Sequence, residues 1–523
     1  MPTTRRTFLT AGGAAAALAL SGGLPEITAA VAGRTGPPDR RDPFTLGVAS
    51  GDPLPDAVVI WTRLAPDPLA PFGGMDRVPV EVQWQVATDE QFHHVVRAGT
   101  ARTGPEVSHS VHVDVRGLQP WRHYWYRFRV NGRLSPVGRT RTAPAYGADV
   151  GELSLAFASC QAWWEGWYTA YADMARREHD VVFFLGDYIY EFGIDRGIRP
   201  HSNEPYITQQ CVTLDEYRVR YAAYKLDADL QRAHAVAPWV VTLDDHEVVD
   251  NWADEAHPSA PPAQFRVRRA NAFRAYWEHM PLRLSRLPKG PDIPLYRRFR
   301  YGRLAEFSVL DTRQYRSDQA YGDGTKAPGP ETADPARTIT GDAQEKWLLD
   351  GLAASQTRWN VLAQQTAMAR LDTKDGPEVL VPMDTWDGYE ASRSRILDGA
   401  VDRGVRNLVS IAGDLHRSVA SDLKQDFTDP GSPVVGAEFV GTSITSGIDG
   451  EDLDAGGATL LRENPHMKFG NFQRGYVSCS ITPQRWVSDY RVVDKVSVQG
   501  GTVSTRAKLL VEDGRPGIAE VQQ

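Results

Sequence analysis

Two oxygen donors stand three residues apart at the end of one apolar run in this chain. The run Val181–Leu185 has the pattern of a buried strand that ends at Gly186, and Asp187 and Tyr190 follow it. A carboxylate and a phenol are hard oxygen ligands, which suit a high-valent cation such as ferric iron. The spacing therefore predicts a metal site at this strand end, where Asp187 could bridge two ions.

Four other apolar runs, at residues 153–158, 239–243, 304–310 and 408–412, end in polar side chains. In chain order these tails carry Cys160, then Asp244, Asp245 and His246, then Asp311 and Arg313, then Asp414 and His416. Open α/β sheets bind ligands at the carboxyl ends of their strands, so we expect the tails to meet. Carboxylates gathered there without cations would repel one another. The sequence therefore predicts a site for several metal ions.

The candidate ligands divide by chemistry. Cys160, Asp187 and Tyr190 form a compact anionic set suited to ferric iron. A second set of candidate ligands would suit one or more divalent ions, and the ligand types favour calcium or manganese. This set is Asp245, His246, Asn251, Asp414 and His416. Such a centre would bind phosphoryl oxygens, generate hydroxide from a bound water and neutralise charge on the departing oxygen. His246 could protonate the leaving group or hold the phosphate.

Each of these residues also has an ordinary structural interpretation. Cys160 could be a buried small residue or a nucleophile, Tyr190 a packed tyrosine, and His246 a solvated loop histidine. Asp244 could brace its neighbours instead of binding metal. For Asn251, binding metal and not binding it are equally open.

Three residues are weaker candidates for contacts with substrate. Arg313, with Arg316 nearby, could bind phosphate through two parallel hydrogen bonds, although such arginines are often salt-bridged scaffold. Trp386 and Tyr389 belong to a WDGY segment whose pattern is that of a turn, and this turn could line the substrate side.

The elements that must position these residues fall into two domains. Residues 43–143 contain short alternating strands without helical periodicity, which predicts an all-β immunoglobulin- or fibronectin-like domain. In residues 150–515, apolar runs alternate with helical patterns such as residues 342–354, which predicts an α/β domain. Alternation resumes after Gly470 and favours a second sheet that closes the fold.

Composition and the N-terminus limit the function classes. A net charge of −8 over 523 residues gives no basic surface, so nucleic acid is not expected as a bound partner. Arg5 and Arg6 precede a short apolar run, and residues 1–33 are predicted to be a twin-arginine signal read by the Tat export machinery. The alternative is an ordinary secretory signal. No later segment could span a bilayer, so a secreted protein without a transmembrane anchor is expected, of open oligomeric state.

The chain has three cysteines, an odd number for an exported protein. We take Cys211 and Cys479 as the candidate disulfide, with the absence of any bridge equally open. The remaining thiol, Cys160, would then be free to bind metal.

The motifs resemble the PhoD-type alkaline phosphatase/phosphodiesterase family, part of the calcineurin-like metallophosphoesterase superfamily with phospholipase D-like relatives. The resemblance is carried by residues 157–161 (FASCQ), 185–191 (LGDYIYE), 244–252 (DDHEVVDNW), 310–316 (LDTRQYR), 386–389 (WDGY) and 412–416 (AGDLH). The superfamily's usual Asp-x-His after the first strand is replaced here by Ser159 and Cys160, which makes a two-zinc centre doubtful.

The resemblance implies a four-layer α+β metallophosphoesterase-type sandwich after the all-β domain. It also implies an Fe³⁺–Ca²⁺ centre, with Cys160, Asp187 and Tyr190 on iron. Calcium would be held by Asp187, Asp245, Asn251, Asp414 and His416. The expected activity is hydrolysis of phosphate mono- and diesters by a metal-activated hydroxide, with His246 and Asp187 as catalytic residues. The alternatives are a phospholipase D-like phosphodiesterase acting on phospholipids and a degenerate calcium-binding surface module.

Overall fold

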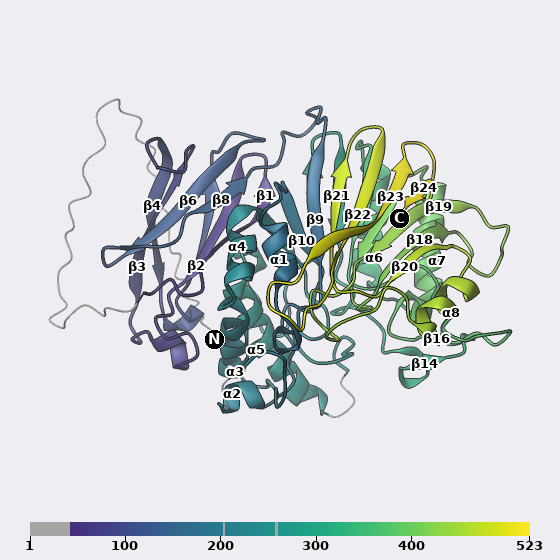
Figure 1. The fold of residues 1–523 in the computed structure, drawn as a ribbon, viewed down its shortest axis with the longest axis horizontal. Helices are drawn as coiled ribbons and strands as arrows, with labels where there is room; N and C mark the ends of the chain where they lie inside the picture. Colours follow the sequence, from purple (N-terminus) through teal and green to yellow (C-terminus); the bar gives the residue numbers. More distant parts are fainter. Residues whose placement is uncertain (1–41, 202–203, 257–259) are drawn as a thin grey trace, which may run out of the picture. The chain divides into compact units, whose positions relative to one another are not determined.

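The structure of this chain is a computed structural model that describes residues 42–201, 204–256 and 260–523 (Figure 1). The predicted export signal at residues 1–33 lies outside the described residues. Among the helices that are described, none is long and apolar enough to cross a membrane.

Two large sheets lie at the centre of the fold. The first sheet contains β1 (Val48–Leu54), β2 (Ala57–Arg63), β5 (Ser110–Arg116), β9 (Leu153–Ala158), β10 (Val181–Phe184), β11 (Pro238–Val241), β21 (Gly475–Ile481), β22 (Arg485–Val493), β23 (Val503–Glu512) and β24 (Glu520–Gln522). Its order is β24-β23-β22-β21-β9-β10-β11-β1-β2-β5, and β9, β10 and β11 are parallel. The second sheet contains β12 (Arg297–Tyr301), β13 (Ala305–Val309), β15 (Trp359–Ala363), β17 (Leu408–Ala412), β18 (Ser418–Lys424), β19 (Val434–Val440) and β20 (Met467–Asn471). Its order is β12-β13-β15-β17-β19-β18-β20, with β13, β15, β17 and β19 parallel.

Helices cover the outer faces of both sheets. Those against the first sheet are α1 (Thr169–Met174), α3 (Leu214–Lys225), α4 (Ala228–Val236) and α5 (Pro262–His279), and those against the second are α6 (Asp342–Ala354) and α7 (Glu390–Asp402). The period of two in β9 shows the division, since Leu155 and Phe157 pack between the sheets while Ala156 and Ala158 face the helices. The predicted four-layer α/β sandwich is confirmed. Two short helices complete the set, α2 (Pro205–Thr208) and α8 (Ala455–Glu463).

The N-terminal region is all-β, as predicted. A five-stranded sheet contains β3 (Val80–Ala87), β4 (Val95–Thr103), β6 (His123–Val130), β7 (Arg133–Leu134) and β8 (Gly138–Arg141). It packs on β2 and β5 through a core that includes Val58, Ile60 and Tyr126. The sequence did not predict β1, which pairs in parallel with β11 and so extends the first sheet into this region. A buried ion pair of 2.8 Å between Asp52 and Arg297 fixes the same junction.

One expectation about the rest of the chain is wrong. The strands after Gly470 do not form the second sheet, because β21 pairs antiparallel with β9 and β22 follows β21 in the first sheet. Alternation identifies a strand but cannot identify its partner. Of the two possibilities left open for Cys211 and Cys479, the structure has the one without a bridge, and all three cysteines are free. Cys211 packs with the helices on one face of the first sheet, whereas Cys479 faces the core between the sheets.

A two-stranded ribbon, β14 (Thr325–Lys326) with β16 (Val381–Pro382), lies apart from both sheets.

Candidate metal centre

The loops after β9, β10, β11 and β17 meet at one place, as the strand tails predict. Two glycines allow this approach: a Cβ on Gly186 would lie 2.4 Å from the Cβ of Asp244, and one on Gly413 would lie 2.2 Å from the hydroxyl of Ser159. The backbone N–H of Cys160 donates to the carbonyl of Gly186 at 3.1 Å, which joins the first two loops. A substitution at either glycine would therefore separate loops that must touch.

Glu247, which sequence reasoning did not select, holds two of these loops together. Its buried carboxylate accepts hydrogen bonds from the backbone N–H groups of Asp187, Tyr188 and Asp244, at 3.1, 2.6 and 2.8 Å. Its place in the DDHE motif was the only sequence signal. Because three backbone N–H groups donate to its carboxylate oxygens, Glu247 fixes the position of the backbone at the site.

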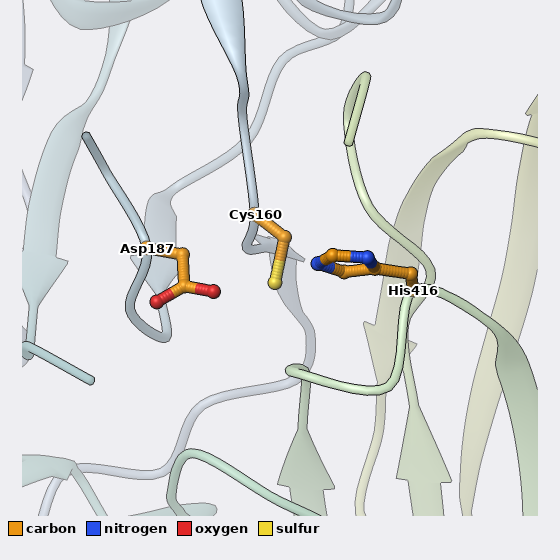
Figure 2. Close-up of side chains that lie close together, drawn as sticks. All are labelled: Cys160, Asp187 and His416. Atoms are coloured by element: carbon orange, nitrogen blue, oxygen red, sulfur yellow. The ribbon is translucent and has the colours of Figure 1, made fainter. Parts of the chain in front are cut away.

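Asp187 is shared by three groups of side chains that could each hold a metal ion. These groups are Cys160 with Asp187 and His416; Asp187 with Asp245 and His246; and Asp187 with Asp244, Asp245 and Asp414. Within each group the donor atoms lie within 4.8 Å of one another. Figure 2 shows the Cys160 thiol between the Asp187 carboxylate and the His416 imidazole. Asp244, for which a bracing role was the favoured interpretation, lies within the third group.

Tyr190 lies against the first of these groups. Its hydroxyl is 3.2 Å from a carboxylate oxygen of Asp187 and 3.0 Å from Nε2 of His416. The phenol therefore lies beside the Asp187 carboxylate and the His416 imidazole, the two residues grouped with the Cys160 thiol. Asn251 is joined to the site through its backbone N–H, which donates to Asp245, while its amide nitrogen donates to Asp323 at 2.8 Å.

Backbone geometry marks five of the predicted ligands. Positive φ values occur at Cys160 (58°), Asp187 (57°), Asn251 (49°), Asp414 (66°) and His416 (54°). Residues other than glycine adopt this left-handed conformation at a cost of about 1–3 kcal/mol each, and such residues cluster at functional sites. The conformation turns each side chain away from the direction of its strand, which no sequence pattern predicted.

The electrostatics of the buried acidic side chains favour bound cations, because ionised carboxylates this close together repel one another. Burial raises the pKa of Asp187 well above its usual range, and the neighbouring carboxylates of Asp245 and Asp244 raise it further. Burial likewise raises the pKa of Asp414 to about 6 and that of the Cys160 thiol well above normal. Carboxylates and thiolates that are ionised in a buried site need positive charge nearby. Metal ions would supply that charge, so the donor set fits a metal centre.

Retention of metal should therefore depend on pH. The raised pKa values of Cys160 and Asp414 mean that the ion-free site holds protons up to higher pH, and metal must displace those protons. Binding should weaken as pH falls through about 6. We expect dialysis against one chelator to remove metal at pH 5 and to spare it at pH 8, as measured by elemental analysis. Circular dichroism at both pH values checks that the chain stays folded, and equal retention would contradict the expectation.

His246 is held by Glu191, a second residue that sequence reasoning missed. Nδ1 of His246 lies 2.9 Å from a carboxylate oxygen of the fully buried Glu191, whose other oxygen accepts from the N–H of Asp250. Nε2 of His246 is left facing Asp245 and Asp250, at 3.9 and 3.8 Å. Burial alone would lower the pKa of His246, but the carboxylates of Asp245 and Asp187 raise it well above normal. The imidazole is thus oriented with one nitrogen toward the centre.

Replacing Glu191 should impair His246 without removing it. Loss of such an outer-shell partner typically costs about 10–100-fold in activity or metal affinity. We expect Glu191→Gln, which keeps an oxygen acceptor, to lose less kcat/KM than Glu191→Leu, which keeps none. The exposed Glu512→Gln serves as the matched control. Equal activity of both Glu191 variants and the wild type would show that His246 does not need this partner.

Arg313 and Arg316 are buried in an ion-pair network. Arg313 contacts Asp244, Asp245 at 3.4 Å, and both oxygens of Asp384 at 2.9 and 2.7 Å. Arg316 donates to Asp384 at 2.6 Å, and both guanidinium side chains have no exposed area. This geometry favours the scaffold interpretation of Arg313, because its donors are committed to carboxylates. Asp384 was not selected from the sequence, where nothing but its place before the WDGY segment marked it.

Trp386 and Tyr389 support that network from the core. The indole N–H of Trp386 donates to Gln364 at 3.0 Å, and the hydroxyl of Tyr389 donates to the carbonyl of Ser317 at 2.7 Å. Both rings are buried in the hydrophobic cluster beneath α6 and α7. They fix the turn that begins just after Asp384.

Comparisons with known proteins show the family of this chain. Residues 155–490 match the PhoD-like phosphatase family, and residues 29–144 match its N-terminal domain. Alkaline phosphatase D of Bacillus subtilis (strain 168) is 48% identical over 519 residues, which are 99% of this chain and 89% of that protein. A solved structure titled "Structure of PhoD" superposes with a TM-score of 0.90 at 48% identity, covering 93% of this chain and 94% of that one. The chain therefore belongs to the PhoD-like phosphatase family.

Proposed function

We propose that this chain hydrolyses phosphate mono- and diesters at the centre built around Asp187. The observation that carries the proposal is that one buried aspartate is common to three groups of metal-competent side chains. Membership of the PhoD-like phosphatase family and the name of its relative, alkaline phosphatase D, support it. A centre for several ions suits phosphate esters because the attacking and the departing oxygen both need charge stabilisation.

The residues of the chain then have distinct roles. Bound metal ions would polarise the phosphoryl oxygens and lower the pKa of water there. Asp187 holds the two sides of the centre together, and Tyr190, Cys160 and His416 close one side of it. As hydroxide, formed when this water releases a proton to solvent, bonds to phosphorus and the ester P–O bond breaks, Nε2–H of His246 can give its proton to the departing alkoxide. Glu191 keeps that nitrogen directed inward through its contact with Nδ1.

We further propose ferric iron and calcium as the ions. Cys160, Asp187 and Tyr190 would hold iron, with His416 beside them, while Asp187, Asp245, Asn251 and Asp414 would hold calcium. The softness of a thiolate and the hardness of the carboxylates support this division. Tyrosinate on ferric iron should give the purified protein a visible colour that Tyr190→Phe removes. A colourless, fully active protein containing stoichiometric zinc would refute the assignment of iron.

A substrate panel beside elemental analysis tests the function. We expect release of phosphate from p-nitrophenyl phosphate and cleavage of bis-p-nitrophenyl phosphate. Phosphatidylcholine included in the same panel would reveal a phospholipase D-like activity by release of choline. Absence of turnover on every ester with metals fully loaded would leave a metal-binding module and would refute the proposal.

We also propose that residues 1–33 direct secretion by the Tat route, on the support of Arg5 and Arg6 ahead of the apolar run. Replacing both arginines by lysine should leave uncleaved precursor inside the cell. Mature protein outside the cell, seen by immunoblot for that variant, would instead indicate an ordinary secretory signal.

A further inference from the structure

Two exposed apolar side chains stand beside residues of the metal centre. Phe192 is 38% exposed, although every residue from 181 to 191 is buried. Ile448 is 42% exposed. Single exposed apolar residues are normal on protein surfaces and need no explanation. Phe192 and Ile448 differ from such residues because their neighbours contact the metal centre and because an arginine holds the backbone of each.

Phe192 contacts the residue assigned to proton transfer. Its ring lies 5.0 Å from that of His246, centroid to centroid, with an interplanar angle of 68°. It also lies 6.3 Å from the ring of Tyr190. His246 keeps only 9% of its surface exposed. The phenyl ring therefore contacts the His246 imidazole while more than a third of the Phe192 surface stays exposed.

The backbone on both sides of Phe192 is fixed. The buried guanidinium of Arg220 donates to the carbonyls of both Tyr190 and Phe192, the latter at 2.5 Å. The next residue, Gly193, lies so close to Thr208 that a Cβ would be 2.3 Å from the Thr208 carbonyl oxygen. Phe192 is thus presented to solvent by a rigid segment.

The backbone of Ile448 is held in the same manner, by an arginine that also contacts His416. Its carbonyl accepts from Nε of Arg474 at 2.7 Å, and Nη1 of the same arginine donates to the carbonyl of His416. The φ of Ile448 is 59°, an outlier for a β-branched residue. The Tyr190 hydroxyl lies 3.0 Å from His416 Nε2, so each arginine binds the backbone of one partner of this contact and of one exposed apolar residue.

We propose that Phe192 and Ile448 are the walls of an apolar subsite for the alcohol portion of the phosphate ester. The subsite would favour esters with an alkyl or aryl group next to the bond that breaks. The inference rests on the proposed function and adds the substrate class to it. Charged side chains and bound metal ions would take the phosphoryl oxygens, so in a monoester the apolar walls can act only on the alcohol that leaves.

The test compares two esters whose leaving groups are both primary alcohols, hexyl phosphate and glycerol 1-phosphate, on the metal-loaded protein. The readout is the ratio of their kcat/KM values. Phe192→Ala should lower the ratio about tenfold, chiefly by raising KM for hexyl phosphate, a size typical of an apolar pocket contact. Phe192→Leu should keep most of the ratio, and Ile448→Gly should lower it while relieving the strained φ. The exposed helical Val267→Ala, outside the centre, should leave the ratio unchanged.

Three results would overturn the subsite. An unchanged ratio in folded Phe192→Ala and Ile448→Gly would show that neither side chain meets the leaving group. Equal losses on both esters would show that Phe192 supports His246 instead of substrate. If the wild-type protein hydrolysed neither ester, the proposed function itself would fail, which is distinct from hydrolysis with an unaltered ratio. Thermal melts of each variant exclude loss of fold as the cause.

Discussion

Replacement of Asp187 by Asn is expected to abolish turnover of mono- and diesters alike. The change removes one oxygen donor from all three groups of metal-competent side chains at once, while the shape of the side chain is kept. Loss of an outer-shell partner costs about 10–100-fold, so loss of a shared donor should exceed about 100-fold in kcat/KM. Elemental analysis should show a parallel loss of more than one ion per chain.

The matched control for Asp187→Asn is Asp350→Asn, because the Asp350 side chain is 60% exposed on α6. Its activity and metal content should equal those of the wild type. The amide oxygen of the substituted side chain could still accept the hydrogen bond from Tyr190. Unchanged positions of the loops in Asp187→Asn are therefore a second check. Retention of full activity by Asp187→Asn would refute the centre as described.

Replacement of Arg313 by Ala should have the largest effect on stability. The fully buried guanidinium contacts Asp244, Asp245 and Asp384, and its removal takes away the ion-pair partner of Asp244 and one cationic partner each of Asp245 and Asp384. Breaking a buried ion pair by removing one partner costs about 3–5 kcal/mol in free energy of unfolding. We expect a lowered melting temperature, with the deficit greatest in metal-free protein because bound cations would neutralise part of the stranded charge.

Two comparisons sharpen the Arg313 test. Arg313→Lys keeps the charge but not the planar fork that spans both oxygens of Asp384, so it should fall between Ala and the wild type. Arg176→Ala removes an arginine that is 68% exposed, and its melting temperature should be nearly unchanged. A melting temperature of Arg313→Ala equal to that of Arg176→Ala would show that the network does not stabilise the fold.

Local pattern was sufficient for much of the fold. The runs at 153–158 and 408–412 and the helix at 342–354 have the same bounds in the structure as in the sequence analysis. Apolar runs of this length between polar tails are strands buried on both faces, and that property is local. Strands β1, β4, β18 and β19 were not recognised, because their buried and exposed residues do not follow a clear alternation. Strand β23 was also missed, although burial alternates over its second half.

The sequence by itself determined which residues could form a metal centre, because ligand chemistry belongs to the side chain and strand ends are visible as polar tails. Asp187, Cys160 and His416 could be selected in this way. Only the tertiary structure decided how they meet: through left-handed backbone at the ligands, glycines where loops touch, and Glu191, Glu247 and Asp384 behind them. These partners act across long sequence separations, such as the 55 residues between Glu191 and His246. A contact of that kind is fixed by the packing of whole strands, and no local pattern records it.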